Sequence, residues 1–333
     1  MLNPPLFESQ IWHPVCESSQ VQDNPLAVTL LCTDLVLWRD EQAVVHCLHD
    51  QCPHRGAKLS LGAVCQGQLR CAYHGWRFGA EGACVHIPAM PAFKPGPAQQ
   101  ARAVAVKEEM GLVWVCLEPA HANSSELPAF SAEHNTTQRK IIAGPYEVKT
   151  SAPRIVENFL DVAHFSFVHH GWLGEENTAQ IANYTVETLA NGFVVKDVRV
   201  DQPQASLSMN QPTTVTYQYE VKHPFCAVLH KVQAVEPGET PAFQESIAVF
   251  IQPVSPISSR VWFRMAVSDW ETDSEDMIAF QDKIFSQDKP VLESQSPREL
   301  PIHSGAEVHM AVDKASVAYR KYLLQCGITF GVC

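Results

Sequence analysis

Four residues between positions 52 and 74 have the types and the spacing of metal ligands. They form two pairs, Cys52-x-His54 and Cys71-x-x-His74, separated by residues 55–70. In a cluster of two irons, two thiolates can hold one iron and two imidazoles the other, which gives a higher reduction potential than four thiolates give. Four glycines allow the sharp bends that loops around a compact inorganic core need: Gly56, Gly62, Gly67 and Gly75.

A zinc ion is the alternative, because it binds the same Cys2His2 ligand set. Zinc modules commonly place two cysteines close together and two histidines further on, whereas here cysteine and histidine alternate within each pair. Four unrelated core residues would leave both spacings without a cause. We therefore predict a mixed-ligand [2Fe-2S] cluster on Cys52, His54, Cys71 and His74.

Residues 52–76, CPHRGAKLSLGAVCQGQLRCAYHGW, resemble the CPHRG…CPYHGW signature of Rieske ring-hydroxylating oxygenases and their ferredoxins, with Ala72 in place of the family's proline. Rieske proteins of respiratory complexes add a disulfide between the two loops. The corresponding positions here are Ala57 and Tyr73, which cannot form one. The resemblance therefore implies the soluble, lower-potential branch.

A second group of possible ligands follows in residues 153–170, where the sequence predicts a helix. Asn158, Asp161 and His164 recur every third residue and would share one helix face. His169 lies five residues after His164, about 500° around a helix, so the two rings would point about 140° apart. They converge only if the helix bulges or ends between them, and Gly171 fits an ending. Two imidazoles and one carboxylate make the facial triad of non-haem iron(II) oxygenases, which leaves positions for dioxygen and substrate.

ENFLDVAHFSFVH resembles the Asp-x2-His-x4-His iron motif of the same family, and FSQDKPVLESQ resembles the distant segment that supplies the carboxylate. The match implies that His164, His169 and Asp288 bind a mononuclear Fe(II). Asp282 stands in a similar Gln-Asp-Lys context, and the residues alone leave it open as the alternative ligand.

Asp161 and Asn158 are the candidate catalytic residues outside the ligand set. The resemblance implies that Asp161 bridges His74 of one subunit and His164 of its neighbour, in a head-to-tail homotrimer. A carboxylate suits this position because it accepts a hydrogen bond from each imidazole and fixes both tautomers. We interpret Asn158 as a residue of the pocket or of the ligands' surroundings.

Length and patterning predict the elements that position these residues. The chain has 333 residues, enough for two domains. Short, closely spaced strands predict an antiparallel β domain over residues 1–134 that carries the cluster. Residues 135–333 predict an antiparallel sheet with helices, a helix-grip-like catalytic domain, so the fold class is α+β.

Local signals refine this prediction. Met110-Gly111 and Asn191-Gly192 predict hairpin turns, and Thr33-Asp34 separates two strands. Thr272-x-x-Glu275 predicts a capping box at the start of a helix. A last helix is expected to stop at Gly327.

Composition restricts which partners the protein is expected to bind and in which compartment it is expected to work. The net charge of −12 argues against nucleic acid, and no apolar run approaches the roughly 18 residues of a membrane span. Eleven cysteines beside an N-terminus without signal-peptide character predict reduced thiols in a cytoplasmic protein. The sequence has no dinucleotide fingerprint, so a separate NAD(P)H-dependent reductase or ferredoxin is expected to supply electrons.

The resemblance covers nearly the whole chain. IWHPVC is similar to the start of methylxanthine N-demethylases, and GITFGVC is similar to the end of hydroxylases of saxitoxin-type guanidinium alkaloids, which the chain resembles more. It implies a monooxygenase that uses dioxygen to hydroxylate a C–H bond of a small nitrogen-containing heterocycle. N- or O-demethylation by the same chemistry and a non-catalytic electron carrier are the alternatives. The substrate and the pocket residues stay open.

Overall fold

The computed structural model describes residues 6–204, 206–207, 211–235, 243–303 and 305–333. The chain forms two compact units, Met1–Leu127 and Pro128–Cys333. The boundary expected after residue 134 falls inside the second unit. Phe130 and Ala132 are buried, and Glu133 receives two hydrogen bonds from Arg264, of 2.9 and 2.6 Å, so this segment belongs to the second core.

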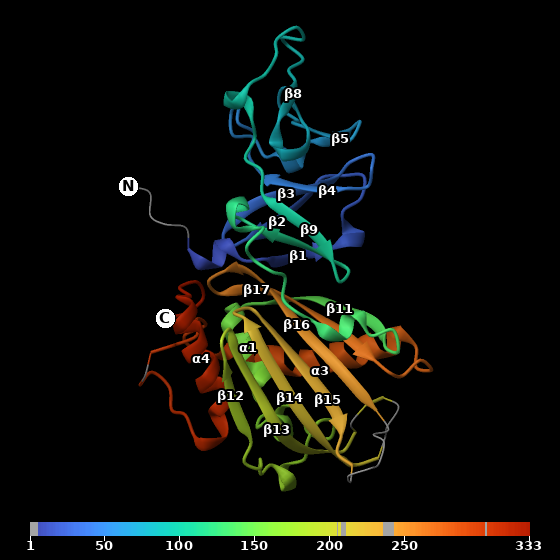
Figure 1. Cartoon of the computed structure of the whole chain (residues 1–333), viewed down its shortest axis with the longest axis vertical. Coiled ribbons are helices and arrows are strands. Elements are labelled where there is room, and N and C mark those ends of the chain that lie inside the picture. The colour runs from blue at the N-terminus through green and yellow to red at the C-terminus, as the bar shows by residue number, and fades with distance from the viewer. Residues whose placement is uncertain (1–5, 205, 208–210, 236–242, 304) are drawn as a thin grey trace. The chain divides into compact units, whose positions relative to one another are not determined.

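The first unit consists of three small antiparallel sheets, drawn from blue to cyan in Figure 1, with strand orders β1-β10-β9, β2-β3-β4 and β5-β6-β7-β8. Its strands are β1 His13–Glu17, β2 Leu26–Leu30, β3 Thr33–Arg39, β4 Val45–His49, β5 Ala63–Cys65, β6 Gln68–Arg70, β7 Arg77–Phe78, β8 Cys84–His86, β9 Ala105–Glu109 and β10 Leu112–Cys116.

Two apolar clusters hold the first unit together. One lies among β1–β4 and β10. The other joins Trp38 and Leu48 to Leu69 and Phe78 of the β5–β8 sheet, and it includes two of the predicted ligands, Cys52 and Cys71. Both cysteine side chains are therefore anchored in a packed core.

Of two predicted strand connections in the first unit, one was right and one was wrong. The β9–β10 turn falls at Met110-Gly111 as predicted. The β2–β3 turn falls at Leu31-Cys32, both with positive φ, instead of at Thr33-Asp34. Asp34 lies within β3, where its carboxylate accepts hydrogen bonds from side chains on neighbouring segments.

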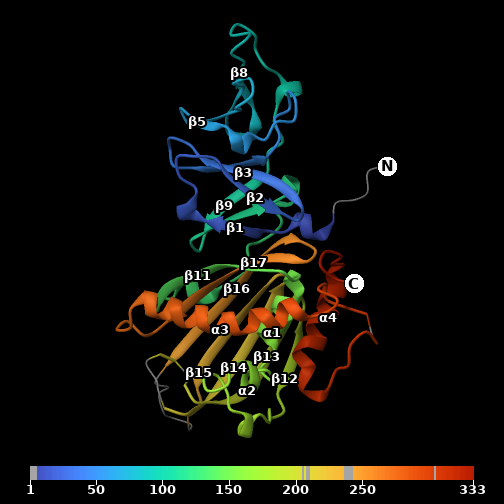
Figure 2. The same cartoon turned by 180° about the vertical axis from the view of Figure 1, so that it is seen from behind.

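The second unit is built on one seven-stranded antiparallel sheet, in the order β11-β17-β16-β15-β14-β13-β12. The strands are β11 Arg139–Val148, β12 Thr185–Leu189, β13 Gly192–Gln202, β14 Thr213–His223, β15 Cys226–Gln233, β16 Gln244–Ser255 and β17 Ser258–Val267. The α-helices are α1 Ala152–Leu160, α2 Phe165–Val168, α3 Ser274–Ser294 and α4 Lys314–Cys326. Figure 2 shows α1 and α3 across one face of the sheet and α4 beside β12. The α+β fold class predicted from the sequence is confirmed.

The single helix predicted over residues 153–170 is wrong. Helix α1 ends at Leu160, because Asp161 has extended backbone angles (φ −88°, ψ 124°), and a one-turn helix, α2, begins at Phe165. Asn158, Asp161 and His164 therefore do not share a helix face. The predicted capping box is also wrong: Asp273 is the N-cap of α3.

Two other signals in the second unit predicted the correct element, one of them displaced by one residue. The β12–β13 hairpin turns at Ala190-Asn191 instead of at Asn191-Gly192, because Leu189 pairs with Gly192. A Cβ atom on Gly192 would lie 1.9 Å from the Val221 carbonyl oxygen. Helix α4 stops at Gly327, which has left-handed backbone angles. Among the described helices, none combines the length and the apolar character needed to cross a membrane.

Candidate functional sites: a cluster-binding loop pair and a His-His-Asp group

The two loops that carry the predicted cluster ligands have the same backbone pattern. The N–H of each cysteine, Cys52 and Cys71, donates to the carbonyl five residues further on (2.8 and 2.9 Å). The carbonyl of each cysteine accepts from the glycine four residues on, Gly56 or Gly75 (2.9 and 3.1 Å). Both glycines have left-handed φ angles, of 71° and 70°. The repeated glycine positions therefore serve one repeated turn.

The four side chains are arranged as a cluster requires. Cys52 and Cys71 are buried, and their sulfurs lie side by side. Burial raises the pKa of the Cys52 thiol to about 11, so a bound cation is needed to hold a thiolate there at neutral pH. The rings of His54 and His74 lie nearer the surface with centroids 4.6 Å apart.

One ring nitrogen in this group supports a metal. His54 Nδ1 is buried and has no hydrogen-bond partner among the residues that the structure describes. The ring is held in place by stacking on Trp76, with centroids 4.6 Å apart and an angle of 8° between the planes. A buried nitrogen lone pair without a donor is costly unless a metal binds it.

The geometry also separates the cluster from the zinc alternative. A single zinc ion would bring four ligand atoms together. In the described residues, three or more possible ligand atoms come within 4.8 Å of one another only in the second unit, and not in the two loops. The cysteine and histidine pairs of the loops fit two neighbouring irons better than one zinc ion.

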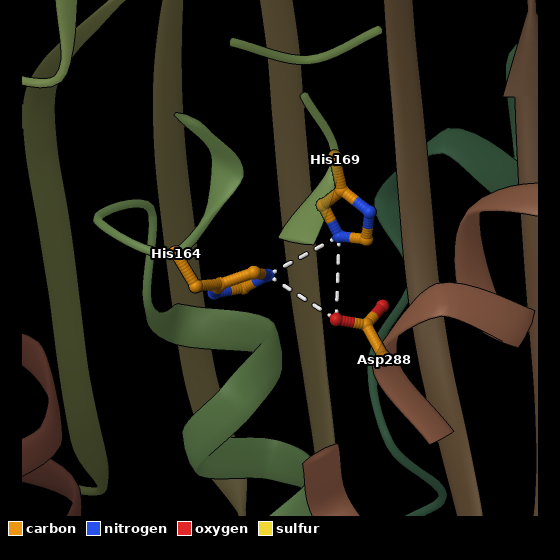
Figure 3. A group of neighbouring side chains, drawn as sticks. All are labelled: His164, His169 and Asp288. Carbon is orange, nitrogen blue, oxygen red and sulfur yellow. Dashed lines mark hydrogen bonds and ion pairs between the residues drawn. The ribbon is translucent and has the colours of Figure 1, made fainter. Parts of the chain in front are cut away.

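The group in the second unit consists of His164, His169 and Asp288, shown in Figure 3. His164 Nε2 lies 3.2 Å from His169 Nε2 and 3.3 Å from Asp288 Oδ1. His169 Nε2 lies 3.2 Å from the same oxygen. The three atoms form a nearly equilateral triangle, the arrangement in which they can bind one metal ion.

The break between α1 and α2 brings the two rings together. His164 precedes α2 and His169 follows it, so the one-turn helix separates them and their Nε2 atoms converge. The N–H of His169 closes this turn on the Phe165 carbonyl (3.1 Å). Asp161 Oδ1 accepts from the N–H of Ala163 (2.8 Å) and so stabilises the segment between the helices.

The other ring nitrogens have acceptors of their own. His164 Nδ1 lies 3.2 Å from Asp161 Oδ2, and His169 Nδ1 lies 2.9 Å from Gln287 Oε1. Each Nδ1 must carry a proton to donate to these oxygens, so each Nε2 of the neutral rings carries a lone pair. Two lone pairs and the carboxylate of Asp288 thus face one another, which fits a cation between them.

Electrostatics also favour a positive charge at this point, either a bound metal ion or, without one, a second proton on His164. Burial disfavours a charge on His164, but the hydrogen bonds to Asp161 and Asp288 outweigh it and raise the pKa of His164 to about 9. Burial likewise opposes the charge of Asp288, but the two histidines lower the pKa of this carboxyl to about 2. The site therefore stabilises positive charge between its side chains.

The structure places the remaining candidates differently. Asn158 Nδ2 donates to Asp288 Oδ1 (3.2 Å), beside the possible metal position. Asp282 instead accepts a 2.5 Å hydrogen bond from the Tyr146 hydroxyl and is outside the group. Sequence reasoning missed Gln287, although it directly precedes Asp288 and therefore extends from the same turn of α3.

An apolar cavity lies between the sheet and the helices α1 and α3, and the His-His-Asp group forms part of its wall. Its apolar lining includes Phe159, Leu229, Ile247, Met265 and Phe285. Such a cavity with a few polar groups is the usual form of a small-molecule site.

Family comparison agrees with this arrangement. Residues 11–106 match the family described as Rieske [2Fe-2S] domain, and residues 148–326 match the family described as vanillate O-demethylase oxygenase C-terminal domain. The chain belongs to the Rieske oxygenases, oxidoreductases that incorporate oxygen.

Individual relatives make this more specific. The chain is 33% identical over 324 residues to methylxanthine N1-demethylase NdmA of Pseudomonas putida, covering 94% of this chain and 87% of that protein. It is 29% identical over 343 residues to methylxanthine N3-demethylase NdmB of the same organism, covering 97% and 90%. The solved structure of NdmA with caffeine superimposes with a TM-score of 0.82 at 30% identity, covering 96% of this chain and 90% of that one. The family and enzyme class expected from the sequence are confirmed.

Proposed function

We propose that this chain is a monooxygenase that inserts one oxygen atom of dioxygen into a C–H bond of a small nitrogen-containing heterocycle. The second oxygen atom leaves as water, with two electrons and two protons supplied from outside. The observation that carries the proposal is the convergence of His164, His169 and Asp288 on one point at the wall of an apolar cavity. Three protein ligands on one side leave room for dioxygen and substrate.

The product depends on which C–H bond is oxidised. Hydroxylation of a ring carbon leaves an alcohol. Hydroxylation of an N-methyl group gives a hemiaminal, which releases formaldehyde and leaves an N–H group. The two relatives named above are methylxanthine N-demethylases, and this favours demethylation over ring hydroxylation. No contact within the described residues favours a non-catalytic electron carrier.

Each group has a definable role in this chemistry. A mononuclear Fe(II) on the three side chains would supply dioxygen activation, and a [2Fe-2S] cluster on the two loops would supply electrons. Asp161 and Gln287 hold the Nδ1 protons of the two histidines, and so keep each Nε2 lone pair directed at one point. Asn158 fixes the carboxylate of Asp288, and the apolar lining excludes water from the oxidised carbon.

Asp161 has a further proposed role in electron transfer. Its side chain is 36% exposed while one oxygen is 3.2 Å from His164 Nδ1, so a second imidazole can reach the carboxylate from outside the unit. We place His74 of a neighbouring subunit there, in a homotrimer that works in the cytoplasm with a separate NAD(P)H-dependent reductase or ferredoxin. Asp161→Asn is expected to keep both metal centres and to slow product formation at least tenfold; loss of the cluster in this variant would contradict the bridge.

Single-turnover chemistry tests the proposed function. Chemically reduced, iron-loaded protein is mixed with dioxygen and a panel of N-methylated, N-unsubstituted and O-methylated heterocycles, and products are identified by mass spectrometry. Formaldehyde with loss of a methyl group would establish demethylation, and a gain of one oxygen would establish ring hydroxylation. Two irons per chain instead of three, with dioxygen uptake absent, would refute the oxygenase and support the electron carrier.

A further inference from the structure

The cavity beside the His-His-Asp group contains one buried ion pair that the proposed chemistry does not use. Lys231 on β15 and Glu245 on β16 are directly opposite each other in the sheet. Both side chains line the cavity. Their neighbours in the same cross-strand row are Tyr217 and Val267. The next row, about 7 Å further along the strands, contains apolar residues of the cavity wall, including Leu229 and Ile247.

The pair is poorly suited to a purely structural role. The ammonium nitrogen and the carboxylate oxygen are 3.7 Å apart, although the side chains are only 6% and 14% exposed. Burial lowers the pKa of Lys231 and raises the pKa of Glu245, while each partner favours the charge of the other. Replacing such buried pairs by apolar residues of similar size is often neutral or stabilising. Because both side chains form part of the cavity wall, a molecule bound in the cavity can contact both of them.

Of the other polar groups that line the cavity, Asp269 and Tyr217 have defined partners, whereas the buried Tyr219 hydroxyl has no hydrogen-bond partner among the described residues. Asp269 accepts hydrogen bonds from the N–H groups of Glu271 and Thr272 and from the Thr272 hydroxyl. The Tyr217 hydroxyl accepts from Gln202 (2.7 Å). The Glu245 carboxylate contacts the Lys231 ammonium through one oxygen at 3.7 Å. A carboxylate has about four acceptor sites, so the other oxygen can accept a hydrogen bond from a bound molecule.

We propose that Glu245 and Lys231 recognise the substrate of the oxygenase through an N–H group next to a carbonyl on its ring. Glu245 accepts the hydrogen bond of the ring N–H, and the Lys231 ammonium donates to the neighbouring carbonyl oxygen. This inference rests on the proposed function and specifies its substrate class: neutral heterocycles with a lactam or imide edge.

Charge explains why the class is neutral. The two side chains together carry no net charge and act as a dipole. A cationic substrate would meet the ammonium, and an anionic one would meet the carboxylate, at short range in a medium that screens poorly. A neutral N–H/C=O edge is complementary to both partners at once, and a site built to bind an N–H group rejects the analogue that lacks it.

Theobromine and caffeine form a matched pair of probes. They differ at one ring nitrogen, which carries a hydrogen between two carbonyls in theobromine and a methyl group in caffeine. Dissociation constants are measured by calorimetry on the iron-loaded full chain. We expect theobromine to bind about 10- to 100-fold more tightly, the usual range for a hydrogen bond to a charged group.

Two double variants complete the test. Lys231→Met with Glu245→Met removes both charges together, and it should remain folded and bind the two probes with equal affinity. Lys196→Met with Glu187→Met removes an exposed ion pair of β12 and β13 outside the cavity lining, and it should keep the wild-type preference. A preference that survives in the first variant, or equal or absent binding of the probes by the wild type, overturns the recognition role.

Measuring both oxidation and binding on the wild-type protein distinguishes a failure of this inference from a failure of the proposed function. A wild type that oxidises some member of the panel without preferring theobromine would retain the oxygenase and refute the ion-pair assignment. A wild type that prefers theobromine but never oxidises a C–H bond would refute the oxygenase and retain the recognition of an N–H group.

Discussion

Replacing Gln287 by leucine should weaken iron binding, although Gln287 is not itself a ligand. Its Oε1 atom accepts the Nδ1 proton of His169 at 2.9 Å. Leucine is close in size but has no acceptor, so the ring loses the partner that fixes its tautomer and orientation. His169 is 1% exposed, and water therefore cannot replace the lost acceptor.

The size of the effect follows from these contacts. A buried donor left without an acceptor costs about 1–3 kcal/mol, and loss of a hydrogen-bond partner of a metal-binding histidine lowers metal affinity about 10- to 100-fold. Tenfold corresponds to about 1.4 kcal/mol, so the two ranges agree. Because the ring is fully buried, we expect the upper half, about 30- to 100-fold.

The assay is a competition between cluster-loaded, iron-depleted protein and a chelator of known Fe(II) affinity. Gln287→Glu keeps an acceptor and should restore most of the affinity. Gln281→Leu, the same change on the same helix without a contact to the proposed ligands, should leave it unchanged. An unaltered dissociation constant in Gln287→Leu would show that packing alone orients His169 and would refute this reasoning.

Three further outcomes are expected. Asp288→Asn should lose the mononuclear iron, measured by metal analysis, whereas Asp282→Asn should keep it; the opposite result would reverse the ligand assignment. Gly62→Ala should abolish the visible absorbance of the cluster, because its Cβ atom would lie 1.9 Å from a carbonyl oxygen of β6, while Gly96→Ala, with no atom within 4 Å, should be silent. Burial lowers the pKa of His13 from 6.5 to about 4, so the unfolded state binds more protons between these values and stability should fall as pH falls from 6.5 to 4. Chemical denaturation of His13→Gln should show a pH slope smaller by up to about 1.4 kcal/mol per pH unit, and an unchanged slope would contradict this assignment.

The cluster loops were predictable because the residues that define them lie close together in the sequence. Cys52, His54, Cys71 and His74 lie within one short stretch, and the glycines that shape the turns lie between them. The repeated turn in the two loops follows from this spacing. The structure adds the burial of the sulfurs and the position of the rings nearer the surface.

The second site was only partly predictable, because its residues are distant in sequence. Asp282 and Asp288 have similar local contexts, and only the orientation of α3 separates the one that bonds Tyr146 from the one beside the histidines. Helical periodicity also failed between Asn158 and His164, since the carboxylate of Asp161 stabilises a break in the helix.

The roles of Gln287 and of the Lys231–Glu245 pair could not be predicted from the sequence, because the pattern does not show that these side chains are buried. A glutamine on a helix and alternating charged residues in strands are usual on solvent-facing surfaces. Their burial depends on which face of the sheet the helices cover. This is decided by packing across the whole unit.

The separation of the proposed iron ligands along the chain has a mechanical consequence. His169 and Gln287, the neighbour of Asp288, are 118 residues apart, and the chain between them contains β12–β17, all but one strand of the large sheet. An ion bound at both ends fastens this loop as a cross-link would, and its binding free energy adds to the stability of the folded unit. Iron supply would then set the lifetime of the protein as well as its activity, because each loss of iron would remove the cross-link that stabilises the sheet.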